Sequence, residues 1–230
     1  MPKRIIMTNE SAKWGKAIVG DIVYYKDGKI GIMPKDNIDQ SLKSYVIAIV
    51  VGKLLDRLLL LSLNRGEKIP YSATSVLVPN VAVAPWAGWD INAQVDDMAG
   101  KANTDALVSY YGLSASFAAG YCASYNVANL DWYLGGIGEF KYVNNNLSVI
   151  DSVRSALGYG NLFKKIGSEL YTCIWTSTQC EATRSHSLRY PTGQGYDPGD
   201  HDMKKYYSYT NEGTYGLFGM VVYPMASIEL

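Results

Sequence analysis

Cysteine, histidine and long apolar runs are scarce in this sequence of 230 residues. Its three cysteines, Cys122, Cys173 and Cys180, form no Cys-x-x-Cys pair, which excludes a disulfide framework and a structural zinc site. We expect buried free thiols, and the alternative is a bond between Cys173 and Cys180 across a short hairpin. The longest apolar stretch, 54–63, contains two charged residues and is too short to span a bilayer.

An excess of either charge is also missing. Lys plus Arg and Asp plus Glu are balanced at 21 each, so no net field attracts nucleic acid or an anionic membrane. Residues 1–10 lack the apolar run of a signal peptide, and we expect synthesis in the cytoplasm without one. A neutral protein repels its own copies poorly, which favours a component of an assembly over a freely diffusing enzyme.

The abundant residues are 19 tyrosines, 22 glycines and 5 tryptophans. Aromatic residues favour strands and glycine supplies turns, so this composition predicts a protein of strands and loops. Tyrosine also gives rigid contact area at low entropic cost, which is typical of recognition surfaces. Packing between strands is an equally good interpretation of the same tyrosines.

The first half of the chain predicts an arm at 1–16 followed by a small β-rich module at 17–85. Asp27-Gly28 favours a tight hairpin turn within 20–32, and the β-branched run 45–51 predicts a strand buried on both faces. The stretch 54–63 could be a helix by composition, but its length and flanking turns favour two strands joined at Asp56-Arg57. Prolines and glycines punctuate 64–90, which we interpret as the connection between modules, with one short strand at 76–78.

The second half, 86–230, predicts helices and then strands, which is an α+β layout. Helices are expected from the start signal at 103–105 to a stop at Gly112, then at about 116–125, from 138 to a stop at 144–146, and at 148–157 before Gly158. Alternation predicts strands at 171–178, 182–190, 204–209 and 218–224, with a loop at 191–200.

The sequence gives no positive evidence of catalysis, and we expect no enzyme activity, metal or cofactor. His186 lies in an alternating strand and is more typical of a packed residue than of a base. Asp197, Asp200, His201 and Asp202 form a cluster that we interpret as a solvated loop; calcium is the first candidate if it binds an ion. The glycine-rich run 135–138 lacks the Lys-Ser/Thr of a phosphate-binding loop, so a tight connection between packed elements is the simpler interpretation.

Several spaced segments resemble the C-type-lectin-like domains of bacterial surface proteins and phage structural proteins. That family carries W-Y-L-P-x-x-G-E-L and later W-S-S-T. The matching segments here are Asp131-Trp132-Tyr133-Leu134, Gly138-Glu139-Phe140, Asn144, Ile150, Ala156-Leu157-Gly158, Trp175-Thr176-Ser177-Thr178 and Val222-Tyr223-Pro224-Met225. The chain departs from the pattern at Gly135, where the family has proline, and at Tyr223, which replaces arginine.

The resemblance implies a C-type-lectin-like domain at 86–230, in which Trp132, Leu134, Glu139, Trp175 and Ser177 are structural. It also implies that the ligand face follows the tryptophan strand. The residues expected on that face are Arg184, His186, Arg189, Tyr190, Gln194, Tyr196, Asp197, Tyr206, Tyr207 and Tyr209. Aromatic and planar hydrogen-bonding groups suit both sugars and protein surfaces. Packing of strands or of a subunit interface is the alternative role for these tyrosines.

We therefore expect a non-enzymatic structural protein of a virion, resembling those of crAss-like phages, in a tail fibre or head decoration. Its expected partners are other virion proteins, copies of itself in an oligomer such as a trimer, and a host surface glycan, with no nucleic acid or membrane. The absence of a signal peptide favours this hypothesis. The alternative is an exported bacterial carbohydrate-binding surface protein.

Overall fold

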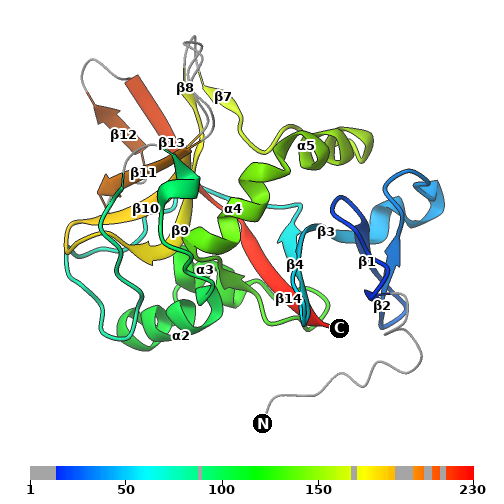
Figure 1. The fold of residues 1–230 in the computed structure, drawn as a ribbon, viewed down its shortest axis with the longest axis horizontal. Coiled ribbons are helices and arrows are strands. Elements are labelled where there is room, and N and C mark those ends of the chain that lie inside the picture. Colours follow the sequence, from blue (N-terminus) through cyan, green and yellow to red (C-terminus); the bar gives the residue numbers. More distant parts are fainter. Residues whose placement is uncertain (1–13, 88–89, 167–169, 190–198, 205–208, 213–215) are drawn as a thin grey trace.

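The computed structural model describes residues 14–87, 90–166, 170–189, 199–204, 209–212 and 216–230. These residues form two large, mainly antiparallel sheets, with helices packed at and around their junction (Figure 1). The mixed α+β class predicted from the sequence is thus confirmed. Among the described helices, none is long and apolar enough to cross a membrane.

The first sheet has the order β2-β1-β3-β4-β14-β6. Its strands are β1 (Ile22–Lys26), β2 (Lys29–Met33), β3 (Val46–Lys53), β4 (Arg57–Ser62), β6 (Tyr133–Leu134) and β14 (Pro224–Glu229). Asp27 and Gly28 both have positive φ, 51° and 76°, which confirms the primed turn predicted between the first two strands. Because β14 pairs with both β4 and β6, this sheet joins the two ends of the chain and both predicted modules.

The second sheet has the order β11-β10-β9-β13-β12, and β5 also pairs with β13. Its strands are β5 (Gly66–Glu67), β9 (Cys173–Gln179), β10 (Arg184–Arg189), β11 (Gly199–Lys204), β12 (Tyr209–Glu212) and β13 (Gly216–Val222). Two short strands, β7 (Lys165–Ile166) and β8 (Leu170–Tyr171), form a separate pair. The pairing of β9 with β13 is parallel.

Six helical segments accompany these sheets within the described residues. They are the 3-10 turns η1 (Gln40–Tyr45) and η2 (Ile91–Ala93), and the helices α2 (Gly100–Tyr111), α3 (Ala118–Ser124), α4 (Ile137–Asn145) and α5 (Leu147–Ala156). Helix α4 contacts β3 of the first sheet and β9 and β10 of the second, so it lies between the two sheets (Figure 1). Helices α2 and α3 contact β6 and pack near β9 and β13.

The core consists of three clusters, and β4 shows how the sequence separates two of them. Leu59 and Leu61 point into the cluster shared with α4, α5 and the second sheet, whereas Leu58 and Leu60 point into a cluster on the opposite face. All four are essentially inaccessible to solvent. Successive side chains of a strand alternate between faces, so a continuous leucine run is what a strand buried on both sides requires.

Three sequence predictions of local structure are wrong in instructive ways. Residues 76–78 form no strand, because the backbone of Val78 bonds to a side chain instead of to another strand. Val78 N donates to Gln179 Oε1 at 3.0 Å, and Gln179 Nε2 donates to Val78 O at 3.2 Å. The stretch 54–63 contains one strand, with the turn at 54–56. Helix α2 begins at Gly100 rather than near 103, because Asn103 is buried in tertiary hydrogen bonds instead of capping the helix.

The end of the chain also differs from its prediction. A strand was expected at 204–209; Lys204 is the last residue of β11 and Tyr209 the first of β12, and 205–208 lie outside the described residues. Strand β11 pairs with β10 along its whole length from Gly199 to Lys204. The first two residues of β11, 199 and 200, were expected to belong to the loop at 191–200, because that stretch is rich in glycine and aspartate. The final strand β14 was missed; Pro224 occupies its first position, where a missing N–H is tolerated.

Candidate functional site

The Trp132-Tyr133-Leu134 segment is the point at which all three core clusters meet. Trp132 packs with the cluster on the outer face of the first sheet, Tyr133 with the central cluster, and Leu134 with the cluster beneath α2 and α3. Three consecutive side chains therefore anchor three separate packing surfaces. This placement gives the motif an architectural role.

The two tryptophans of the motif are each fixed by a hydrogen bond and an aromatic neighbour. Trp132 Nε1 donates to Val127 O at 2.9 Å, and its ring meets Tyr125 edge-on with centroids 5.0 Å apart. Trp175 Nε1 donates to Ile69 O at 2.9 Å and meets Tyr71 in the same way at 5.7 Å. Satisfying the indole N–H lets each ring be buried at little polar cost.

Asp97 is the centre of a buried polar network, which we call the Asp97 network. Its Oδ2 accepts from Thr178 Oγ1 at 2.6 Å and from Asn103 Nδ2 at 2.7 Å, and its Oδ1 accepts from Ala99 N at 3.0 Å. Its backbone carbonyl accepts from Gly138 N at 3.0 Å. Asp97 is 7% exposed, so the three bonds to its carboxylate replace the solvation that this group has lost.

The Thr-Ser-Thr end of β9 connects this network to the start of α4. Thr178 Oγ1 accepts from Ile137 N at 2.9 Å, and Ser177 N donates to Gly135 O at 2.7 Å. Asn103 Nδ2 also donates to Ser177 Oγ at 3.1 Å. The hydroxyl residues of the motif thus hold a helix start and a strand together.

Glu139 is buried in the first turn of α4. Its Oε2 accepts from Gly136 N and its Oε1 from the hydroxyl of Tyr133, both at 2.9 Å. Burial raises the pKa of Glu139 to about 7, because desolvation outweighs these two bonds, and the Asp97 carboxylate adds to the increase. Glu139 therefore caps its own helix and is the one carboxyl group of the motif that is poised to titrate near neutrality.

The glycine-rich run 135–138 joins packed elements tightly. A Cβ on Gly136 would lie 2.4 Å from Asp97 O, and one on Gly138 would lie 2.8 Å from both Asp97 N and Asp97 O. Only glycine permits this approach of two backbones. The backbone N–H groups of 136, 137 and 138 all donate within the protein, which leaves them no role as a phosphate cradle.

Few residues of the predicted ligand face can be placed. His186 on β10 is fully buried, and its Nε2 lies 2.9 Å from Ala84 O. Arg184 on the same strand lies 3.6 Å from Glu181. Only the backbones of Arg189 and Tyr209 are described, in β10 and β12. The remaining members lie outside the described residues: Tyr190, Gln194, Tyr196, Asp197, Tyr206 and Tyr207.

The predicted ion-binding cluster is placed only in part. Asp197 lies outside the described residues, and Asp200, His201 and Asp202 are described only as backbone in β11. Elsewhere in the described part of the chain, no group of three or more His, Cys, Asp or Glu residues gathers to hold a metal ion. The loop predicted at 191–200 is wrong for its last two residues, and the solvated loop expected for the cluster is wrong for Asp200, His201 and Asp202, because these residues lie in β11.

The three cysteines are buried free thiols, as predicted, and Cys173 does not bond to Cys180. Cys173 lies in β9, and Cys180 follows the end of that strand. Burial raises the pKa of the Cys122 thiol well above its ordinary value. A thiol of this kind is a packing group rather than a nucleophile.

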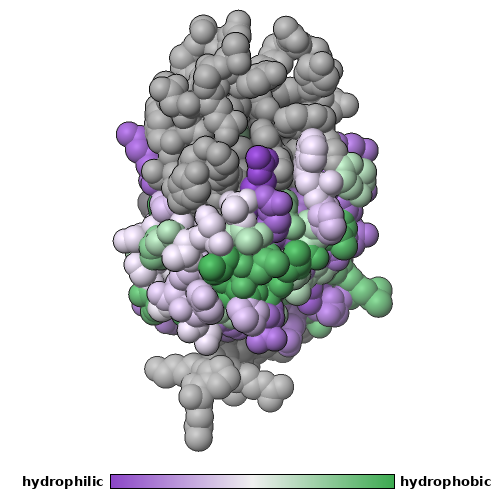
Figure 2. Space-filling view, turned by 90° about the vertical axis from the view of Figure 1, so that its left-hand side faces the viewer, coloured by the Kyte–Doolittle hydropathy of each residue, from purple (hydrophilic) through white to green (hydrophobic). Residues whose placement is uncertain are grey.

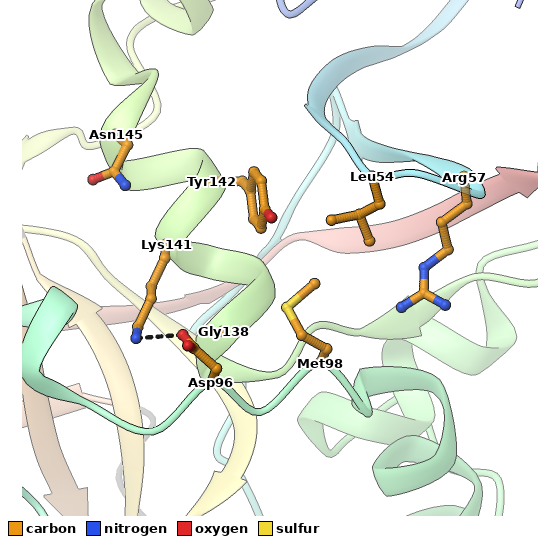
Figure 3. A pocket seen from close by; sticks show the side chains of 8 residues that line it. All are labelled: Leu54, Arg57, Asp96, Met98, Gly138, Lys141, Tyr142 and Asn145. Atoms are coloured by element: carbon orange, nitrogen blue, oxygen red, sulfur yellow. Dashed lines mark hydrogen bonds and ion pairs between the residues drawn. The ribbon is translucent and has the colours of Figure 1, made fainter. Parts of the chain in front are cut away.

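A pocket of about 470 Å³ opens beside α4 (Figure 3). Leu54, Met98 and Tyr142 form its apolar part. Lys141 Nζ pairs with Asp96 Oδ1 at 2.6 Å on one side, and Arg57 extends on the other. The pocket is large enough for a small molecule, but its lysine is already paired.

Sequence reasoning missed the residues that organise this region. Asp97 lies in a stretch between two predicted elements and carries no motif, and Asn103 was assigned to a helix start. Their importance depends on Thr178, more than 70 residues away in sequence, so no local pattern could identify them. The one available signal was the repeated occurrence of small polar residues in the Trp175-Thr176-Ser177-Thr178 strand.

No family model matches the sequence, and no curated protein does. Among solved structures, the fold is similar to that of a fimbrial protein from Bacteroides ovatus, with a TM-score of 0.54 and 12% sequence identity. The match covers 91% of this chain and 49% of the fimbrial protein, so this chain spans about half of that protein's length. At such low identity, the similarity concerns the fold.

Proposed function

We propose that this protein is a non-enzymatic structural component of a bacterial surface assembly of the fimbrial kind. The observation that carries the proposal is the similarity of fold to a Bacteroides fimbrial protein over 91% of the chain. Because nearly the whole chain takes part, the correspondence involves both sheets rather than one common supersecondary unit. This comparison favours the surface-protein hypothesis over a virion component.

The internal use of polar groups supports a structural role. Asp97, Asn103 and Thr178 bond to one another, and Glu139 bonds to Tyr133 and to its own helix start. Active sites need polar groups directed at a substrate, whereas these groups are directed at the protein itself. The most motif-like part of the sequence is therefore scaffold.

An exposed apolar surface supports assembly with other subunits. Of the large hydrophobic side chains that are exposed in the described residues, Leu77, Val83, Trp86 and Val95 belong to the connection before α2. This segment runs along the left side of Figure 1, and Figure 2 shows hydrophobic side chains gathered at the centre of that face. Contiguous apolar patches of this kind mark protein–protein contacts.

The C-type-lectin-like assignment of 86–230 is part of the same proposal. Its support is the ordered set of motif segments, of which Trp132, Tyr133 and Leu134 connect all three core clusters. In that fold the strands after Trp175 would present a ligand to the surroundings, so a glycan-recognition role for Arg184 and the tyrosines that follow is its functional extension.

Fractionation of the organism that produces this protein tests the proposal. Surface appendages sheared from cells and purified should contain the chain, detected by mass spectrometry against a cytoplasmic marker. Recovery of the chain in purified phage particles instead would overturn the fimbrial assignment and favour a virion role. Recovery only with the cytoplasmic marker would overturn both.

A pair of matched variants tests the proposed contact surface. Size-exclusion chromatography with light scattering should detect oligomers of the native protein that weaken in the Leu77→Ser, Val83→Ser double variant. Ile18→Ser is the control, because Ile18 is 50% exposed at a different place in the fold. Equal behaviour of the double variant and the control would show that this face makes no subunit contact.

A further inference from the structure

A second pocket, of about 770 Å³, lies where α5 ends and the chain turns back past the end of β4. Its lining includes Asn64, Arg65, Arg154, Tyr159, Asn161 and Lys164, and we call it the Arg154 pocket. Arg154 lies in the last turn of α5. Gly158 follows with φ of 86°, and Tyr159 N donates back to Arg154 O at 2.8 Å. This reversal brings the Tyr159 ring over the guanidinium, with the Cζ atom 5.7 Å from the ring centroid.

Arg154 is a buried cation that keeps unused donors. It is only 5% exposed, its Nε donates to Gly160 O at 2.8 Å, and its Nη1 donates to Leu63 O at 3.1 Å. A guanidinium has five N–H donors, so three of them have no acceptor among the described residues. No carboxylate of the described chain lies within ion-pair distance of it. A buried charge normally has an ionic partner, whereas Arg154 lines a pocket.

Two further cations surround the same pocket. The Arg65 guanidinium lies 6.0 Å and that of Arg154 5.4 Å from the centroid of the Tyr223 ring, so one aromatic ring positions both. Arg65 pairs with Glu67 at 2.9 Å, which largely satisfies it. Lys164 is exposed on the rim and makes no side-chain bond to a described residue.

The acidic groups near the pocket do not cancel this charge. Glu67, whose side chain is 58% exposed, is the partner of Arg65. Asp151 accepts from Leu162 N at 2.7 Å and acts on Arg154 only at longer range. Three cations and two carboxylates leave the described pocket with an excess of one positive charge. The Arg154 cation is the one that lacks a direct carboxylate.

We propose that the Arg154 pocket binds a small, hydroxyl-bearing organic anion, whose carboxylate or phosphate group meets the free donors of Arg154 and the ammonium of Lys164. A planar guanidinium matches the paired oxygens of such a group. The amides of Asn64 and Asn161 and the half-buried Tyr159 ring line the rest of the pocket and suit a polar body. This site is independent of the proposed assembly role.

Isothermal titration calorimetry of the full chain with glucuronate, glucose 6-phosphate and glucose tests the site. We expect at least one anionic hexose to bind about tenfold or more tightly than glucose, since the charged group supplies the main contact. The ranking of glucuronate and glucose 6-phosphate then identifies the preferred anion. Binding of glucose as tight as that of both anions, or no heat from any of them at about 10 mM, would overturn the proposal.

Charge-matched variants separate the pocket from general electrostatics. Lys164→Glu should weaken anion binding by about tenfold or more, whereas Lys29→Glu, an equally exposed change on β2, should leave it within about twofold. Arg154→Lys keeps the positive charge but loses the planar pair of N–H donors, so it should also weaken anion binding. Because Lys164 is at the surface, circular dichroism should show an intact fold in Lys164→Glu. Equal affinities of the two lysine variants would refute the site.

Discussion

Two buried polar clusters of this protein differ in where their donors and acceptors point. In the Asp97 network every charged or amide group meets another group of the chain, as when Asp97 Oδ2 accepts from both Asn103 and Thr178. In the Arg154 pocket the cation is equally buried, yet three of its N–H groups find no acceptor among the described residues. The two clusters are buried to a similar degree, but only the Asp97 network has a hydrogen-bond partner for each of its charged and amide groups.

The difference shows how a structural polar residue can be told from a binding one. A saturated network stabilises one arrangement of α4 and β9, and opening it to a ligand would cost the bonds already made. An unsaturated cation is costly to bury and becomes favourable only when an anion reaches it. The first cluster should therefore affect stability when mutated, and the second should affect binding.

The largest effect is expected at Asp97. Replacing it by alanine leaves the Asn103 amide, the Thr178 hydroxyl and the Ala99 N–H without their acceptor, all in a buried place. We expect Asp97→Ala to lower the free energy of unfolding by about 3–5 kcal/mol, measured by urea denaturation.

The adjacent residue provides a matched control. Asp96 carries the same side chain, but that side chain is 80% exposed and, within the described part of the chain, pairs only with Lys141. Asp96→Ala should change the free energy of unfolding by less than about 1 kcal/mol. Similar losses for the two alanine variants would show that the Asp97 network has no special role.

A pH-dependent effect is expected at Glu139. Burial raises its pKa from 4.5 to about 7, so the folded protein binds this proton more tightly than the unfolded chain does. Stability is therefore highest below about pH 4.5 and falls as the pH rises through 7, by about 3 kcal/mol for this group. Glu139→Gln should remove that fall, because the amide can accept from Gly136 N and donate to Tyr133.

The measurement is the difference in unfolding free energy between Glu139→Gln and the native protein at several pH values. That difference should grow in favour of the variant between about pH 5 and 8. The contributions of the other titrating groups are the same in both proteins and cancel in the difference. A constant difference across this range would mean that Glu139 keeps an ordinary pKa in the fold.

Much of the fold follows from local sequence. Asp27-Gly28 specified its hairpin, and Gly112 and Gly158 ended their helices with positive φ, because these signals act through the backbone of one or two residues. Strand β14 was not predictable in this way. It exists because it pairs with β4, more than 160 residues earlier, and a proline at its start conceals it.

The candidate sites also differ in whether local sequence or long-range contacts define them. The motif residues Trp132 and Trp175 stand out in the sequence because tryptophan is rare and large and because each lies within a recognisable motif segment. Asp97 and Arg154 do not, since each gains its role from partners brought together only by folding. Arg154 in particular reads as an ordinary cation near a helix end, and its incomplete hydrogen bonding is visible only once Leu63 and Gly160 are placed beside it.

A smaller effect is expected at Tyr223, whose ring lies beside the two arginines that line the Arg154 pocket. Its buried hydroxyl donates to Leu162 O at 3.1 Å and accepts from Arg65 Nη1 at 3.3 Å. Tyr223→Phe keeps the ring that lies near both guanidiniums and should cost about 1 kcal/mol of unfolding free energy. Tyr110→Phe, at a side chain that is 54% exposed, is the control and should be neutral. If Tyr223→Phe leaves the free energy of unfolding unchanged, the hydrogen bond from Arg65 Nη1 to Leu162 O is sufficient for both groups without the hydroxyl.

The smallest effect on stability is expected where the effect on binding is large. Lys164 is exposed on the rim of the Arg154 pocket, so Lys164→Ala should change the free energy of unfolding by no more than about 0.5 kcal/mol in thermal or urea denaturation. A measurable rise in stability at low salt that disappears at high salt would show that Lys164 repels Arg154 and Arg65 in the empty pocket. A loss larger than about 1 kcal/mol would contradict the comparison, because it would make Lys164 part of the saturated framework. The pairing of an unchanged stability with a weakened affinity is the signature that separates a binding group from a structural one.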